Sequence, residues 1–365
     1  MSNALDRIVN VRIDINRAPA TVDAYEHLLI IGPGPAKAPE KAPAPIGSYT
    51  DLDAVAAAGW AISGDNADPV GVAARLAFTQ AKKPAYIYIA VQQTSEAGLE
   101  GIDVTVQRAL GNPDWWAICP AGIAEENYQA IADAIEDTER CFLYTYCSGA
   151  DPVGGEKFRS AGFIGLTSMT AEQPAATSPN RYLSVAATVS AILNKAGSET
   201  WAYWKLNGVT PIVLSSQEAK ALEDANVTYY AQIGSLNCTI GGKVKAGEWI
   251  DVIRFRDWQK NHIQQTVFSL FMDNTKVPYT DKGIALVHNA VLSSLKTGVA
   301  NGGIIDSVDD AEGNVSPGYT VTVPKAREIS AEMRQQRKLP GVGFSAHLTN
   351  AIHVTEISGD VNYSA

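Results

Sequence analysis

The sequence has little charge, few cysteines and no pattern of metal ligands. Charged residues make up 19% of the 365 residues, and the four cysteines form no CxxC pair and lie near no histidine at zinc-ligand spacing. Cys141 and Cys147 share a predicted strand whose length separates them by roughly 20 Å, which is beyond disulfide reach. We therefore expect reduced, buried thiols and no metal site. The cysteines are Cys119, Cys141, Cys147 and Cys238.

Catalytic and nucleotide-binding motifs are also missing. The sequence contains no GxxxxGK[ST], HExxH or GxSxG motif. Gly32 and Gly34 follow an apolar strand pattern at 28–31, as in a dinucleotide site, but the third glycine is absent. A Pro/Ala segment over 33–45 follows where a helix N-terminus must supply amide donors. We predict no catalytic residue and no cofactor; an α/β enzyme of unrecognised type is the alternative.

A basic footprint and a membrane-length apolar run are absent as well. The 29 basic and 39 acidic residues give a net charge of -10, which argues against a nucleic-acid binder because phosphates need a basic surface. The first residues, Met1 to Arg7, resemble neither a signal peptide nor an anchor. We expect assembly in a cytoplasm, without nucleic acid and without direct membrane insertion.

Strand and helix patterns alternate from about Ala20 to Ile233. Apolar strand patterns and amphipathic helix patterns follow one another, which is typical of a layered α/β domain. The pair Gly241-Gly242 favours a tight turn and predicts a hairpin over 237–245. The predicted strands lie at 28–31, 85–91, 115–119, 141–146 and 163–166, and the predicted helices at 70–81, 125–136, 181–195 and 216–225.

Two long helix patterns follow, over 249–272 and 284–299. In the first, charged residues at 256, 257 and 260 interrupt the apolar stripe, whereas Phe255 and Trp258 point to the opposite side. Either the chain's own layers or a neighbouring subunit covers these two aromatic side chains, and for Trp258 we favour the former. The predicted fold class is therefore mixed α+β and α/β, with an outer α/β domain and an inner α+β domain that holds two long helices.

The second long helix has signals at both ends. Thr280 or Asp281 is a candidate N-cap just after Pro278, and Gly298 and Gly302 are candidate stop signals. The helix is therefore expected to begin near 281 and to end near 298.

Both chain ends have the character of strands. Apolar residues alternate with polar ones near the N-terminus, and less regularly near the C-terminus. A lone terminal strand is unstable unless it pairs with a sheet edge, so each end is expected to pack with the inner domain or with a neighbour. We expect arms at 1–20 and 349–365, an outer domain at 21–240 and an inner domain at 241–348. The arm residues are Val9, Val11, Ile13, Ile15, Ile352, Val354, Ile357 and Val361.

One basic cluster runs against the overall sign of the charge. Only Glu328 and Glu332 offset it. A solvated helix face is one interpretation, and docking to an acidic partner is the other. The cluster consists of Lys325, Arg327, Arg334, Arg337 and Lys338.

Three stretches resemble the contractile tail sheath proteins of myophages. They are Gly-Glu-Trp-Ile-Asp-Val-Ile-Arg-Phe-Arg-Asp-Trp at 247–258, Lys-Val-Pro-Tyr-Thr-Asp-Lys-Gly at 276–283 and Gly-Val-Ala-Asn-Gly-Gly at 298–303. The sheaths of R-type bacteriocins and type VI secretion machines are more distantly similar. The resemblance is strongest from about residue 240 to the C-terminus.

The resemblance implies a structural subunit of a virion tail, not an enzyme. Such subunits polymerise as stacked six-membered rings around a tail tube and contract to drive the tube through the host envelope. It further implies arms that add strands to neighbouring subunits, and an inner-domain helix that faces the tube, which would make the basic cluster tube-facing. The implied partners are further copies of the chain, the tail tube protein, and the baseplate and tail terminator proteins, with assembly in the host cytoplasm. Another tail or secretion component is the alternative.

Overall fold

A six-stranded sheet forms the centre of the larger part of the molecule. The computed structural model describes residues 22–37, 39, 42–95, 98–112, 114–309, 313–356 and 358. The strand order is β2-β3-β1-β6-β7-β8, in which β2 and β3 are antiparallel and all other neighbours are parallel. The strands are β1 (Leu28–Pro33), β2 (Ile46–Tyr49), β3 (Ile87–Gln92), β6 (Ala117–Pro120), β7 (Cys141–Tyr146) and β8 (Ser160–Ile164).

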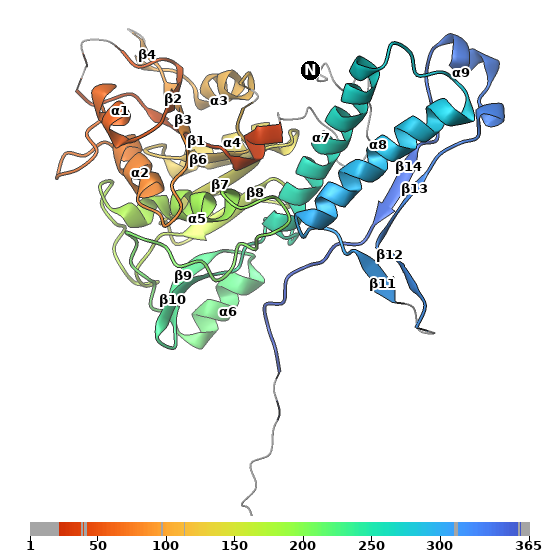
Figure 1. Cartoon of the computed structure of the whole chain (residues 1–365). Helices are drawn as coiled ribbons and strands as arrows, with labels where there is room; N and C mark the ends of the chain where they lie inside the picture. The colour runs from red at the N-terminus through yellow and green to blue at the C-terminus, as the bar shows by residue number, and fades with distance from the viewer. Residues whose placement is uncertain are drawn as a thin grey trace, which may run out of the picture.

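Helices cover both faces of this sheet (Figure 1). Leu28 and Ile30 of β1 lie in one hydrophobic core with α2 (Pro69–Phe78) and α5 (Leu183–Ile192). Leu29 and Ile31 lie in a second core with α3 (Ile102–Leu110) and α4 (Tyr128–Glu136). Successive strand residues point to opposite faces, so a strand covered on both sides is apolar throughout. The predicted mixed fold class with a layered α/β part is confirmed.

Smaller elements complete this α/β unit, by which we mean residues 22–249. The helix α6 (Ser216–Asp224) begins with a capping box, in which the Ser215 side chain accepts from the Glu218 amide and Glu218 accepts from the Ser215 amide. The remaining elements are η2 (Val22–Glu26), α1 (Leu52–Ala57), β4 (Thr94–Ser95), β5 (Gly98–Leu99), η3 (Glu125–Asn127), η4 (Pro179–Tyr182), β9 (Tyr229–Ile233) and β10 (Leu236–Ile240).

The prediction that a hairpin turns at Gly241-Gly242 was wrong. The hairpin joins β9 to β10 and turns at 234–235, with Ile233 paired to Leu236. Gly241 and Gly242 follow β10 with φ of 109° and 102°. A Cβ on Gly242 would lie 2.7 Å from the Cβ of Trp201. Gly241 therefore serves a close approach to Thr228 and Gly242 a close approach to Trp201, and the pair forms no second turn.

The helices α7 (Ile250–Asp273) and α8 (Asp281–Ala300) lie side by side, as Figure 1 shows. Both predicted helices are confirmed, and Thr280 is the N-cap of α8, where its side chain accepts from the Gly283 amide. Gly298 is no stop signal, because α8 continues past it. A Cβ at Gly298 would meet Oε1 of Gln259 at 2.2 Å, so this glycine lets α8 approach α7. Gly302, with φ of 90°, follows the helix end.

Small sheets and short helices follow α8. The strands β13 (Tyr319–Thr322) and β14 (Gly343–Ala346) pair antiparallel, and β13 packs against α8. A second ribbon joins β11 (Ser307–Asp309) to β12 (Val315–Pro317), and η5 (Ala326–Glu328) and α9 (Ala331–Gln335) lie between β13 and β14. None of the helices in the described part of the chain combines the length and the apolar character that crossing a bilayer requires.

Candidate assembly interface

A buried charge pair ties α7 to the α/β unit. Asp257 of α7 accepts from Nη1 and Nη2 of Arg159 at 2.5 and 3.0 Å, and from Nε1 of Trp116 at 3.2 Å. The Tyr25 hydroxyl donates to the Asp257 carbonyl at 3.0 Å. Arg159 and Asp257 are both buried. A buried carboxylate with this many donors is fully compensated, so α7 is held against the strand ends of the sheet.

Two further buried pairs extend this joint. Arg254 pairs with Glu199 at 2.5 Å and also donates to the carbonyls of residues 25, 192 and 194. Lys260 pairs with Glu139 at 2.5 Å. Burial, followed by the charge of Asp257, raises the pKa of Glu139 to about 7 against the opposing effect of Lys260. We call Arg159–Asp257, Arg254–Glu199 and Lys260–Glu139 the α7 joint.

The aromatic side chains on α7 are covered within the chain. Phe255 and Trp258 are 4% and 8% exposed. Their rings stack at a centroid distance of 5.9 Å, and Trp258 stacks on His262 at 4.8 Å. A Cβ at Gly303 would lie 2.3 Å from the Phe255 ring. Intrachain cover, the favoured prediction for Trp258, is therefore confirmed, and these aromatic side chains are not available to a neighbouring subunit.

The ribbon β13–β14 has two open edges among the described residues. One of its faces packs on the main core through Tyr319, Val321 and Phe344, whereas Thr320 and Ser345 on the other face are exposed. Two strands alone make a weak sheet, so the ribbon depends on α8 for support. Unpaired backbone donors and acceptors along such edges accept further strands.

The chain leaves the molecule next to this ribbon as an extended arm. Leu348 forms an isolated antiparallel bridge with Ile304, and the Thr349 amide donates to the Gly303 carbonyl at 3.2 Å. The residues from 351 to 356 form no helix or strand, and Ile352 and Val354 are 88% and 82% exposed. The other predicted arm residues, Val9, Val11, Ile13, Ile15, Ile357 and Val361, lie outside the described residues.

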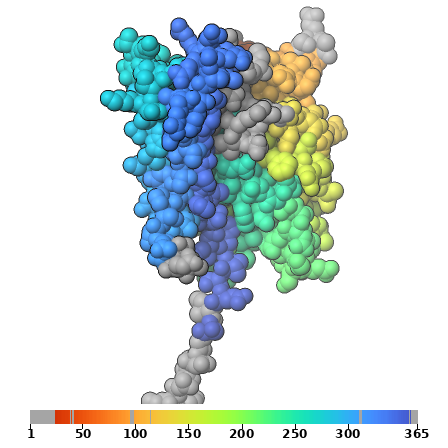
Figure 2. All heavy atoms as spheres, turned by 90° about the vertical axis from the view of Figure 1, so that its right-hand side faces the viewer, coloured from red at the N-terminus to blue at the C-terminus, as the bar shows by residue number. Residues whose placement is uncertain are grey.

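The basic cluster lies on the face that Figure 2 shows, at the end opposite to the one from which the arm leaves. The Ala326 amide donates to Oδ1 of Asp281 at 2.8 Å, which ties η5 to the start of α8. Arg334 donates to the carbonyls of Ala326 and Ile329, so it braces this segment internally. All five predicted basic residues are exposed, and none forms an ion pair with a described acidic side chain. The structure thus brings Lys325, Arg327, Arg334, Arg337 and Lys338 together on one short segment.

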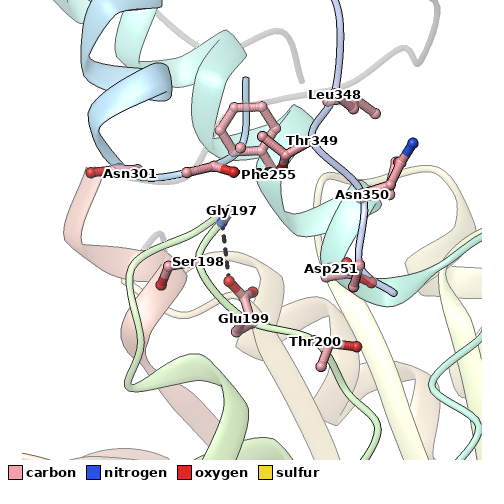
Figure 3. A pocket seen from close by; sticks show the side chains of 14 residues that line it. Gly197, Ser198, Glu199, Thr200, Asp251, Phe255, Asn301, Leu348, Thr349 and Asn350 are labelled. Atoms are coloured by element: carbon pink, nitrogen blue, oxygen red, sulfur yellow. Dashed lines mark hydrogen bonds between the residues drawn. The ribbon is translucent and has the colours of Figure 1, made fainter. Parts of the chain in front are cut away.

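A cavity of about 460 Å³ lies beneath the root of the arm (Figure 3). It is lined by the 197–200 loop, the first turn of α7, residues 301–303 and residues 348–351. Asp251 and Glu199 are its acidic residues, and Glu199 is already paired with Arg254. Burial, followed by the charge of Glu199, raises the pKa of Asp251 to about 7. Among the hydroxyl groups of the lining, that of Thr200 is hydrogen-bonded to Nε2 of His353 at 2.8 Å.

The cysteines have the properties of unreactive thiols. Cys119, Cys141 and Cys147 are buried, and all four cysteines are unpaired. Burial raises the pKa of Cys147 to about 11, which keeps it as a thiol at neutral pH. Within the described residues, no group of three or more histidine, cysteine or acidic side chains has the geometry of a metal site.

Comparisons with known proteins identify the fold. Residues 250–361 match a family model described as the C-terminal domain of E217 tail sheath protein gp31-like proteins. A chain of the helical sheath of the anti-feeding prophage in its contracted state is similar with a TM-score of 0.68 at 15% identity, over 97% of this chain and 99% of that one. None of the curated protein sequences matches this chain.

Two further structures extend the likeness. A chain of the 6-fold symmetrised baseplate of the anti-feeding prophage has a TM-score of 0.67 at 16% identity, over 96% of this chain and 99% of that one. A chain of the PVC sheath complex, from an extracellular contractile injection system in its contracted state, has a TM-score of 0.61 at 13% identity, over 97% and 98%.

The chain therefore has the fold of contractile sheath proteins along almost its whole length. The resemblance predicted from the sequence is confirmed, by the tail sheath model over 250–361 and by the shared fold over the remainder. These similar proteins are parts of sheaths and of a baseplate, which are structural assemblies.

Proposed function

We propose that the chain is the subunit of a contractile sheath and polymerises into a helical tube. The observation that carries this proposal is an arm with exposed apolar side chains, Ile352 and Val354, on a molecule whose ribbon β13–β14 has open edges in its described part. Extended segments bind such edges through main-chain hydrogen bonds, and their alternate side chains give specificity. Each copy then offers both halves of a repeating contact, as an open polymer requires.

The proposed polymer is a stack of six-membered rings. The likeness to a chain of a 6-fold symmetrised baseplate supports this ring size. In the proposal residues 1–20 and 349–365 are arms, 21–240 form the outer domain and 241–348 the inner domain. The arms exchange strands with neighbours in the same and in adjacent rings, which keeps the polymer connected.

Contraction in this proposal needs no nucleotide. The lattice moves from a metastable extended form to one of lower free energy, and the movement drives the tube through the host envelope before genome ejection. The α7 joint supports rigid-body movement, because three buried ion pairs fix α7 to the α/β unit. Flexing would then concentrate in the arms.

We assign the tail tube as the partner of the basic cluster. Exposed cations without a described acidic partner attract an acidic surface and steer its docking. The baseplate and tail terminator proteins would bind the two ends of the polymer. The particle would be a phage tail that is assembled in the cytoplasm of the host bacterium.

Negative-stain microscopy of the purified chain tests the assignment. We expect tubes with a regular axial repeat, with or without the tube protein. The matched control is the same protein with Ile352→Ser and Val354→Ser, which should give dispersed particles. Discrete small oligomers from the parent at high protein concentration would contradict the assignment and favour an enzyme or a different tail component.

A further inference from the structure

His353 lies in a clamp formed by residues distant in sequence. Its ring is edge-on to Trp249 at a centroid distance of 4.6 Å and edge-on to Tyr203 at 5.5 Å. Its Nε2 is hydrogen-bonded to Oγ1 of Thr200 at 2.8 Å. The Tyr203 hydroxyl donates to the His353 carbonyl at 2.6 Å. Ring and backbone are thus held at the same time, by three residues of the α/β unit.

Two features indicate that the clamp is built for this contact. Tyr203 has φ of 67°, a left-handed conformation that a tyrosine rarely adopts, and in this conformation its hydroxyl reaches the arm. Trp249 is held beneath the amino group of Lys243, 4.8 Å from its ring centroid. Strained backbone persists only where the surrounding contacts stabilise it. At this position the Tyr203 amide donates to the Thr239 carbonyl at 2.7 Å, and the Tyr203 hydroxyl donates to the arm.

The clamp also determines which side chains face outward. His353 is partly buried, while its neighbours Ile352 and Val354 are 88% and 82% exposed. Successive residues of an extended chain point to opposite sides. With the His353 ring held inward, both apolar side chains must therefore point away from the subunit.

Between its two attachments the chain spans a cavity. The first attachment is the hydrogen bond from the Thr349 amide to the Gly303 carbonyl, and the second is His353 in the clamp. Residues 348–351 form part of the lining of the cavity of about 460 Å³ (Figure 3). A segment above a cavity has few packing contacts of its own. The arm root is therefore held mainly at its two ends.

We propose that His353 is the releasable anchor of the C-terminal arm. Docked in the clamp of Thr200, Tyr203 and Trp249, it fixes where the arm leaves the subunit and presents Ile352 and Val354 to a neighbouring copy. Released, the arm swings about Thr349 and loses that orientation. The consequence for polymerisation rests on the proposed sheath function, whereas the anchoring itself does not.

Electron paramagnetic resonance of the full chain tests the anchor. A nitroxide is attached to Glu356→Cys in a Cys238→Ser background, because the other three cysteines are buried. Spectra are recorded below the concentration at which sedimentation detects polymers. Loss of two aromatic contacts and one hydrogen bond in His353→Ala should raise the ratio of mobile to docked label at least tenfold. Tyr203→Phe, which removes a single hydrogen bond, should raise it less.

His347→Ala is the matched control. His347 is exposed, is near the same arm and should leave the spectrum unchanged. Identical spectra for the parent and His353→Ala would overturn the anchor, whatever the parent does in microscopy. If the parent never forms tubes but His353→Ala still shows a tenfold rise in mobile label over the parent, the anchor is supported and the sheath function is rejected. If the parent forms tubes, His353→Ala should form them several-fold more slowly.

Discussion

At the scale of single residues, burial within the chain decides the role of the aromatic side chains on α7. Trp258 is 8% exposed and lies between Phe255 and His262. In protein lacking residues 1–16, which we expect to be monomeric, Trp258→Ala should lower the free energy of unfolding by about 3 to 5 kcal/mol. Urea denaturation measures this change. An unchanged midpoint would mean that the intrachain packing of Trp258 contributes little to stability.

The raised pKa of Asp251 makes the folded chain less stable as the pH rises. Its pKa is raised to about 7 in the folded chain, so the folded state holds this proton more tightly than the unfolded state. The stability from this group is full below the unfolded pKa near 4 and is lost as pH rises through about 7. Asp251→Asn should therefore gain about 1 to 2 kcal/mol over the parent at pH 8, after allowance for partial exposure and the lost charge at the helix start.

Denaturation of both proteins at pH 5 and pH 8 checks this sign. The gain should be present at pH 8 and small or absent at pH 5. Parallel stability curves for the two proteins across this range would mean that Asp251 titrates normally.

At the scale of elements, the α7 joint is the feature that holds the helical hairpin to the α/β unit. Lys260→Met leaves Glu139 buried without its cation and should destabilise the chain by about 3 to 5 kcal/mol. The double variant Lys260→Met with Glu139→Gln removes the charge as well and should recover at least half of that loss. Equal losses in the single and double variants, by thermal unfolding, would show that this pair contributes little.

The basic cluster belongs to the same scale. Arg334 braces η5 and α9 internally, so charge reversal should spare it. Replacing Arg327, Arg337 and Lys338 with glutamate should weaken assembly on the tube about tenfold or more while sparing tube-free polymerisation, and raised salt should mimic this. Equal loss of both assembly modes would instead indicate a contact between sheath subunits. The control is the same number of charge reversals on the α/β unit, Lys37→Glu, Lys83→Glu and Lys195→Glu, which should leave assembly on the tube unchanged.

Helices and strands could be predicted from the sequence more readily than the contacts that join them. The two long helices and most strands followed from periodicity, and the Thr280 cap followed from its position beside Pro278. Gly241 and Gly298 were misread because a glycine that permits close packing looks the same in sequence as one that turns the chain. The partners of α7 were missed because Arg159 and Glu139 lie 98 and 121 residues away from theirs. A charge one or two residues before a buried strand, as at Arg159 and Glu139, was the available signal.

At the scale of the whole molecule, the central claim is that the arms join otherwise independent subunits. Of the described residues beyond 350, none belongs to either hydrophobic core, and Ile352 and Val354 are exposed. Deleting residues 351–365 should therefore leave the fold intact while removing the contact to the next copy.

Analytical sedimentation of three proteins tests this claim most directly. The full chain, the chain without 1–16 and the chain without 351–365 are compared at equal concentration, with circular dichroism to verify folding. We expect long polymers from the full chain and folded monomers from both truncated proteins. Polymers of full length from either truncated protein would contradict this claim, and an unfolded truncated protein would mean that the deleted arm belongs to the subunit's own core.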